Sequence, residues 1–154
     1  MRCYCWISVL AVCWGCASGP STGADGARVP ESEKGNFAAL KADDPEVAAA
    51  KKKAQESLDS FISKYNSKDL YKAKMVKFPM PVKGQTEHIW MDVSEIKDGT
   101  FIGTLANDSF YDPQLKVGAP VSVHRNDVED WMLMDRKDNM EGGFSIEAVR
   151  KHAK

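Results

Sequence analysis

The chain has 154 residues, of which 28% are charged, and its formal net charge is −1. This near balance excludes the basic excess of a dedicated nucleic-acid binder, and the length suits one soluble globular domain. All four cysteines lie within the first 16 positions, so the remainder has no thiol for a disulfide framework, a thiolate metal site or a cysteine nucleophile.

Residues 1–15 have the features of a signal peptide. Met1 and Arg2 give a positive end, and the stretch from Cys3 to Trp14 carries no charge. This stretch is shorter than the roughly 20 apolar residues that span a bilayer, and no other run in the chain reaches its length. We therefore expect no transmembrane helix in the mature chain.

Gly15 and Cys16 resemble the end of a bacterial lipobox, in which a small residue precedes a cysteine that is acylated and becomes the new N-terminus. Cys13 and Trp14 stand where such boxes usually carry leucine and a small residue. We predict lipidation at Cys16, with ordinary cleavage among the small residues that follow Gly15 as the alternative. Because several acyl chains hold a protein firmly, we expect a membrane-anchored lipoprotein of the bacterial cell envelope that faces the periplasm or the exterior. Without the lipid, the protein would be periplasmic or secreted.

Residues 16–43 have the small, polar, Gly- and Pro-containing composition of a flexible tether. A flexible segment of this length has a root-mean-square span of roughly 30 Å. We expect the globular domain over residues 44–154, standing clear of the membrane surface.

The domain is expected to begin with one long amphipathic helix that runs to about Tyr65. Asp44 and Pro45 suit its start, because an Asp side chain accepts first-turn amides and proline tolerates the first helical position. Apolar residues then recur at spacings of three and four, which places them on one buried stripe. Asn66 suits a left-handed residue just past the helix end. The lysine run at 51–53 is interpreted as a solvated helix face.

Beyond the helix the apolar period changes to two, which predicts strands. The first strand begins at Tyr71, contains a bulge or ends near Met75, and is closed by prolines 79 and 81. A clearer strand covers residues 87–93. The turn at 97–99 then predicts a hairpin into a strand over residues 100–106, because aspartate and glycine accept positive φ.

The last third of the chain predicts a long loop, two strands and a helix. Residues 107–120 are polar and irregular, and strands are expected at 121–124 and 128–134. Gly142 and Gly143 permit a tight turn, after which Ser145 is expected to cap a helix. The predicted fold is α+β: a long N-terminal amphipathic helix packed on a small bent antiparallel sheet of four to five strands, with a short C-terminal helix.

The order of several motifs over residues 44–150 resembles the bacterial family called domain of unknown function 2314. The motifs include His88-Ile89-Trp90-Met91, Gly103-Thr104-Leu105-Ala106-Asn107-Asp108, Val128-Glu129-Asp130-Trp131-Met132 and Gly142-Gly143-Phe144-Ser145. Family members often carry proline where this chain has Ser109, and an acid where it has Ala119. Since the family's activity is not established, the resemblance implies no catalytic residues.

A binding surface for a peptide or glycan is predicted along the strand at 87–93 and the following loop, because exposed aromatic residues recur at binding hot spots. Trp131 shares a strand face with Leu133 and is assigned to the core, whereas Trp90 fits the surface and the core equally well. Asp130 is interpreted as a solvated or capping carboxylate. The candidate binding residues are His88, Trp90, Asn107, Asp108, Phe110 and Tyr111.

A metal site is a weaker interpretation. His88 and His124 lie on predicted strands and, with Asp92 or Asp130, would form a site of two histidines and one carboxylate if the strands faced one another. Nothing in the spacing of these residues requires that arrangement. We therefore predict no metal and no other cofactor.

These patterns favour a non-enzymatic binding module tethered to the envelope. Its expected partners are the membrane, through the lipid anchor, and a protein or envelope polymer, with no role for nucleic acid. Two alternatives stay open: a hydrolase that acts on an envelope polymer, and an immunity-type protein that binds a toxin.

Overall fold

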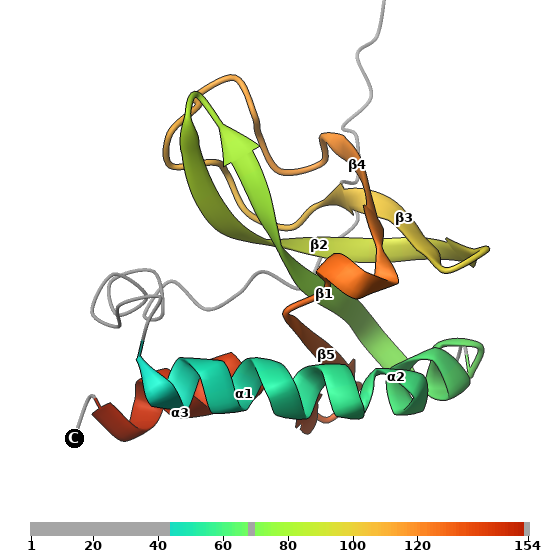
Figure 1. The fold of residues 1–154 in the computed structure, drawn as a ribbon. Helices are drawn as coiled ribbons and strands as arrows, with labels where there is room; N and C mark the ends of the chain where they lie inside the picture. Colours follow the sequence, from blue (N-terminus) through green and yellow to red (C-terminus); the bar gives the residue numbers. More distant parts are fainter. Residues whose placement is uncertain (1–43, 68–69, 153–154) are drawn as a thin grey trace, which may run out of the picture.

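The computed structural model describes residues 44–67 and 70–152, which form an α+β domain (Figure 1). Within these residues, six antiparallel strands make one open sheet in the order β4-β3-β2-β1-β5-β6. Helices α1 and α2 lie along one end of the sheet, and α3 lies beside α1. The elements are α1 (Pro45–Glu56), α2 (Leu58–Tyr65), β1 (Tyr71–Val82), β2 (Gln85–Lys97), β3 (Thr100–Leu105), β4 (Pro120–His124), a short 3₁₀ turn (Arg125–Asp127), β5 (Asp130–Asp135), β6 (Met140–Gly142) and α3 (Phe144–His152).

The predicted signal peptide (1–15), the lipidated Cys16 and the tether (16–43) lie outside the described residues. Among the residues that the structure does describe, no helix is both long enough and apolar enough to cross a membrane.

The single long helix predicted at the start of the domain is divided at Ser57. Asp44 caps α1 as expected, since its side chain accepts a hydrogen bond from the Glu46 amide at 2.8 Å. At Ser57 the backbone leaves helical geometry (φ −104°, ψ 5°), and the hydroxyl donates to the Lys53 carbonyl at 2.7 Å. Such back-bonding bends helices, and the chain resumes as α2. Asn66 has a right-handed φ of −70°, which corrects the left-handed helix end predicted there.

β1 lies near the centre of the sheet and is buried on both faces. Val76 and Phe78 belong to a main hydrophobic cluster with α1 and α2, whereas Met75 belongs to a second cluster on the opposite face. The change of apolar phase near Met75 therefore reflects two covered faces, and the bulge or strand end predicted there is wrong. The register of β1 against β5 shifts earlier, between Tyr71 and Ala73.

Pro79 and Pro81, which were expected to close β1, lie inside it. β1 pairs with β5 only as far as Lys77, whereas its pairing with β2 continues to Val82. Beyond Lys77 one side of β1 is therefore an edge, where a missing N–H breaks no ladder. As a result, β1 and β2 extend as a long curved arm away from the helices (Figure 1).

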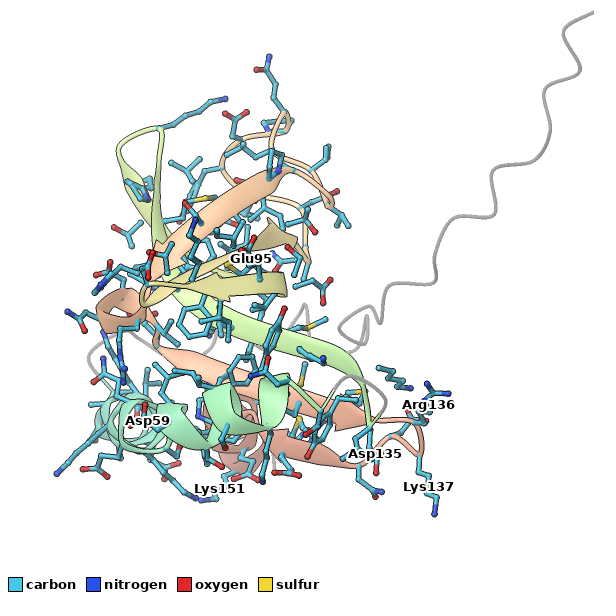
Figure 2. All side chains as sticks on the ribbon, turned by 90° about the vertical axis from the view of Figure 1, so that its right-hand side faces the viewer. Asp59, Glu95, Asp135, Arg136, Lys137 and Lys151 are labelled. Atoms are coloured by element: carbon cyan, nitrogen blue, oxygen red, sulfur yellow. The ribbon has the colours of Figure 1, made fainter. Side chains whose placement is uncertain are left out.

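The sheet has six strands rather than the four to five predicted. The additional strand is β6, which pairs with β5 in a segment where no strand was predicted. The turn between these two strands can be found in Figure 2 by the labelled residues Asp135, Arg136 and Lys137.

Two predicted glycine turns are confirmed by positive φ angles. Asp98 and Gly99 have φ of 49° and 74° between β2 and β3, as the primed hairpin turns require. Gly142 and Gly143 have φ of 77° and 68° where β6 leads into α3. The helix begins at Phe144, so Ser145 lies within its first turn, and the cap predicted at Ser145 is wrong. The Ser145 amide and hydroxyl donate instead to Asp130.

Candidate functional site

Loop 106–119 joins β3 to β4 and lies beside the first half of β2. The Ala106 amide donates to the Trp90 carbonyl at 2.9 Å, and the Trp90 amide donates to Oδ1 of Asn107 at 3.0 Å. The loop therefore starts as a continuation of β3 along β2. Asn107, one of the predicted binding residues, holds the loop in this position.

Glu87 of β2 fixes the turn of this loop. Its carboxylate accepts hydrogen bonds from the Ser109 hydroxyl at 2.6 Å and the Phe110 amide at 2.7 Å. The Ser109 hydroxyl in turn accepts from the Asp112 amide at 3.0 Å, and Ser109 is buried. Sequence reasoning missed Glu87, because its partners lie at least 22 residues along the chain and one of them is a backbone amide.

Two aspartates fasten the remainder of the loop. Oδ1 of Asp108 accepts from the Val117 amide at 3.0 Å, which closes the loop on itself. Asp112 pairs with Lys83, at the tip of the β1–β2 arm, at 3.2 Å. A hydrogen bond from the Gln114 amide, assisted by Lys83, holds the pKa of Asp112 below its ordinary value. The loop is thus tied both to itself and to the arm.

Phe110 and Tyr111 project from this fixed loop, and we call the pair the aromatic tip. Phe110 is 84% exposed and Tyr111 is 41% exposed. Their rings pack edge to face, with centroids 5.2 Å apart. The structure therefore brings Asn107, Asp108, Phe110 and Tyr111 together on one ordered loop.

His88 and Trp90 do not extend the aromatic tip. Trp90 is 4% exposed, so its indole is part of the second hydrophobic cluster and not of an accessible surface. Among the described residues its buried Nε1 has no hydrogen-bond acceptor. Nδ1 of His88 contacts the Glu129 carboxylate, which Lys51 of α1 also reaches at 2.9 Å. His88 therefore helps to join β2, α1 and the start of β5.

A charged cluster made by Lys77, Glu129 and Asp130 lies where β1 meets β5. Burial lowers the pKa of Lys77, although both carboxylates act to raise it. Burial also raises the pKa of Asp130, against the opposing effect of hydrogen bonds from Ser145 and Trp131. Burial acts to raise the pKa of Glu129 as well, but hydrogen bonds with His88 and Lys51 outweigh it and leave that pKa lowered. The charge of each of these three groups is therefore offset by a neighbouring group of opposite charge. These contacts link β1 to the start of β5.

Asp92 differs from this cluster because it has no compensating partner. The structure gives its carboxylate neither a hydrogen bond nor an ion pair within residues 44–67 and 70–152. Burial alone raises the pKa of Asp92 to about 6. An uncompensated, mostly buried carboxylate opposes folding when it is ionised.

Asp92→Asn is expected to stabilise the domain at neutral pH by roughly 2 kcal/mol, after allowance for solvent screening. The folded-state pKa of Asp92 lies above its ordinary value of 3.8, so the native state favours the protonated form. In the wild type, the favourable contribution of the protonated Asp92 carboxyl is fully present below the unfolded pKa and is lost as the pH rises through about 6. The advantage of Asp92→Asn therefore appears over the same pH range. Urea unfolding at several pH values should show that the free energies of unfolding of wild type and Asp92→Asn become equal near pH 4, at about the unfolded pKa.

Asp127→Asn is the matched control, because it removes the same charge from an exposed position. If both substitutions change the free energy of unfolding equally at every pH, the burial of Asp92 makes no separate contribution to stability.

The two-histidine arrangement, the weaker interpretation of the sequence, does not form among the described residues. Nδ1 of His124 accepts from the Asn126 amide at 3.3 Å, while His88 is engaged with Glu129. In the part of the chain that the structure describes, no group of three His, Cys, Asp or Glu side chains is arranged to hold a metal ion.

The sheet order, the helices packed at its end and the fixed loop define this protein as an α+β domain built on one open antiparallel sheet. The chain belongs to the bacterial family DUF2314, described as an uncharacterized protein conserved in bacteria, which matches residues 44–153. The resemblance predicted from the motifs is thereby confirmed.

A curated relative is the uncharacterized protein YegJ of Escherichia coli (strain K12). The two chains are 32% identical over 103 residues, which covers 67% of this chain and 66% of the relative. This chain thus spans about two thirds of the length of that relative. No solved structure matches the chain.

Proposed function

We propose that this protein is a binding module of the bacterial envelope, held there by a lipid on Cys16, that recognises a partner protein through the aromatic tip. The observation that carries this proposal is the 84% exposure of Phe110 on a loop that Glu87 holds in place. A large apolar side chain presented in this way gains free energy when a partner covers it.

Preorganisation of the loop supports this proposal. A loop that is ordered before binding loses little conformational entropy when it docks, so more of the contact energy becomes affinity. The hydrogen bonds from Ser109 and Phe110 to Glu87 supply that order.

The surroundings of the tip fit a protein partner. The ion pairs Lys83–Asp112 and Lys116–Asp108, each at 3.2 Å, place compensated charges next to the exposed rings. An apolar anchor inside a polar rim is the usual anatomy of a protein interface. We therefore assign the partner an apolar pocket that accepts the Phe110 ring.

The position of the tip is compatible with a membrane anchor. Loop 106–119 and the end of the β1–β2 arm lie at one end of the domain, and the start of α1 lies at the other (Figure 1). A tether that enters at α1 would attach to the end of the domain opposite the aromatic tip, so the anchor would not cover the surface proposed to bind the partner.

Phe110→Ala is expected to abolish capture of the partner while leaving the free energy of unfolding unchanged, because the ring is mostly exposed. The measurement is photo-crosslinking in living cells, with a benzophenone amino acid at the exposed Gln114. Wild type should give a protease-sensitive adduct of discrete mass, and Phe110→Ala should not.

Leu70→Ala is the matched control, since Leu70 is an exposed apolar residue (61%) on a different surface. It should leave the adduct intact. An adduct that persists in Phe110→Ala, or one removed by glycosidases and not by proteases, would contradict the proposed protein partner.

Cys16→Ser is expected to release the protein from the membrane fraction or to leave its leader uncleaved, because the serine hydroxyl cannot take the thioether-linked lipid. Cys13→Ser changes a leader cysteine and should fractionate like wild type. If Cys16→Ser also behaves like wild type in fractionation and electrophoretic migration, the lipid anchor is wrong.

A further inference from the structure

Four methionines gather on the face of the sheet opposite the main hydrophobic cluster, and we call Met75, Met132, Met134 and Met140 the methionine face. Met75 and Met132 are buried, and Met134 and Met140 are partly buried. All four pack in the second cluster with Trp90.

The strand register makes these side chains direct neighbours. Met75 of β1 lies opposite Met132 of β5, and Met134 of β5 lies opposite Met140 of β6. Met132 and Met134 are two residues apart on one strand, so they share a face. Side chains directly opposite one another have Cβ atoms about 4.5–5.5 Å apart, a distance that flexible thioethers easily close.

The use of methionine differs sharply between the two sides of the sheet. Methionine supplies four of the eight residues of the second cluster, whereas the larger main cluster contains only Met91 and Met80. On β5 itself, Trp131 and Leu133 serve the main cluster while Met132 and Met134 face the other way. Leucine would fill the same volume, so packing alone does not require this choice.

A carboxylate lies next to one residue of the methionine face. Asp92 of β2 is directly opposite Met75, and its carboxylate has no cationic partner among the described residues. The Trp90 ring packs in the same cluster, and an indole face attracts cations. The face therefore combines soft ligands, an uncompensated carboxylate and an aromatic ring.

We propose that the methionine face binds one Cu(I) ion through thioether sulfurs, with Asp92 supplying the compensating charge. Thioether sulfur is a soft ligand that selects Cu(I) over the hard cations. The partly exposed Met134 and Met140 give the ion a route from solvent. This site lies on the sheet face and is independent of the aromatic tip.

The test uses Ag⁺ as a redox-stable probe and the full chain with Cys3, Cys5, Cys13 and Cys16 replaced by serine, because thiolates would also bind the ion. Methyl NMR with labelled methionine should show Ag⁺-dependent shifts for Met75, Met132, Met134 and Met140, with saturation at one equivalent. The methyl signals of Met80 and Met91 should not move.

Met132→Leu combined with Met134→Leu is expected to weaken Ag⁺ binding by at least about tenfold, and Met80→Leu should leave it unchanged. Even if the double variant folds poorly, the Ag⁺-dependent methyl shifts of the protein that retains all four methionines test the proposed site. Absence of stoichiometric binding, or shifts at Met80 and Met91 instead of the four methionines, would overturn the site. Loss of binding without loss of crosslinking at the aromatic tip would leave the proposed function intact.

Discussion

Asp130→Ala is expected to destabilise the domain by about 3–5 kcal/mol, because it removes a buried, multiply bonded charge. Asp130 is 1% exposed, and its two carboxylate oxygens accept from the Trp131 and Phe144 amides and from both the amide and the hydroxyl of Ser145. Without Asp130 the first amides of α3 lose their acceptor, and Lys77 loses a nearby opposite charge. Equilibrium urea unfolding measures the loss.

Ser145→Ala is the graded comparison for this prediction. It removes only the hydroxyl bond of 2.6 Å to Asp130 and should cost about 1 kcal/mol. Hydrogen exchange should also show that Asp130→Ala loses protection in α3 before the sheet does. A change of less than about 1 kcal/mol for Asp130→Ala would contradict the assigned capping role.

Gly103→Ala is expected to cost about 3 kcal/mol or more, because its methyl group would overlap backbone atoms. A Cβ at Gly103 would lie 1.8 Å from the carbonyl oxygen of Asp92 and 3.1 Å from Cε of Met91. Gly103 pairs with Val93 next to the register shift of β2, where the two strands approach closely. The backbone cannot yield without breaking the ladder between β2 and β3, so thermal unfolding should occur at a markedly lower temperature.

Gly84→Ala separates steric overlap from backbone strain. Gly84 has φ of +79°, and a Cβ there would meet nothing within 4 Å. It should therefore cost only about 1 kcal/mol of left-handed strain. Equal costs at Gly84 and Gly103 would show that the close approach of β2 and β3 is not what demands glycine.

Local signals predicted much of the fold. The Asp44 cap, the hairpin turn at Asp98 and the glycine turn before α3 each depend on residues adjacent in the chain, and all three are confirmed. The assignment of Trp131 to the core also holds, because Trp131 is 3% exposed and its Nε1 donates to the Ala54 carbonyl at 3.1 Å.

The errors arise where a local pattern has two possible tertiary causes. In β1 the apolar residues switch from one set of alternate positions to the other. This switch indicated an interruption on the assumption that only one face of the strand is buried, but both faces are covered by hydrophobic clusters, so both sets are apolar. The prolines of β1 indicated an end, yet the shorter pairing with β5 leaves an edge that tolerates them. Ser57 carries no sequence mark of a break, because serine also occurs within helices.

For the candidate site, the sequence by itself determined that Phe110 and Tyr111 lie together on a polar loop, since composition and turn residues act locally; their exposure comes from the structure. Tertiary structure alone decided that Trp90 is buried, that Glu87 fixes the loop and that four methionines share one face. These facts depend on strand register and on contacts between distant residues. Shifting a strand by one position reverses which side chains are buried. The local turn at Asp98 and Gly99 sets the register of β2 against β3, but no turn joins β1 to β5, so their register depends on the tertiary structure.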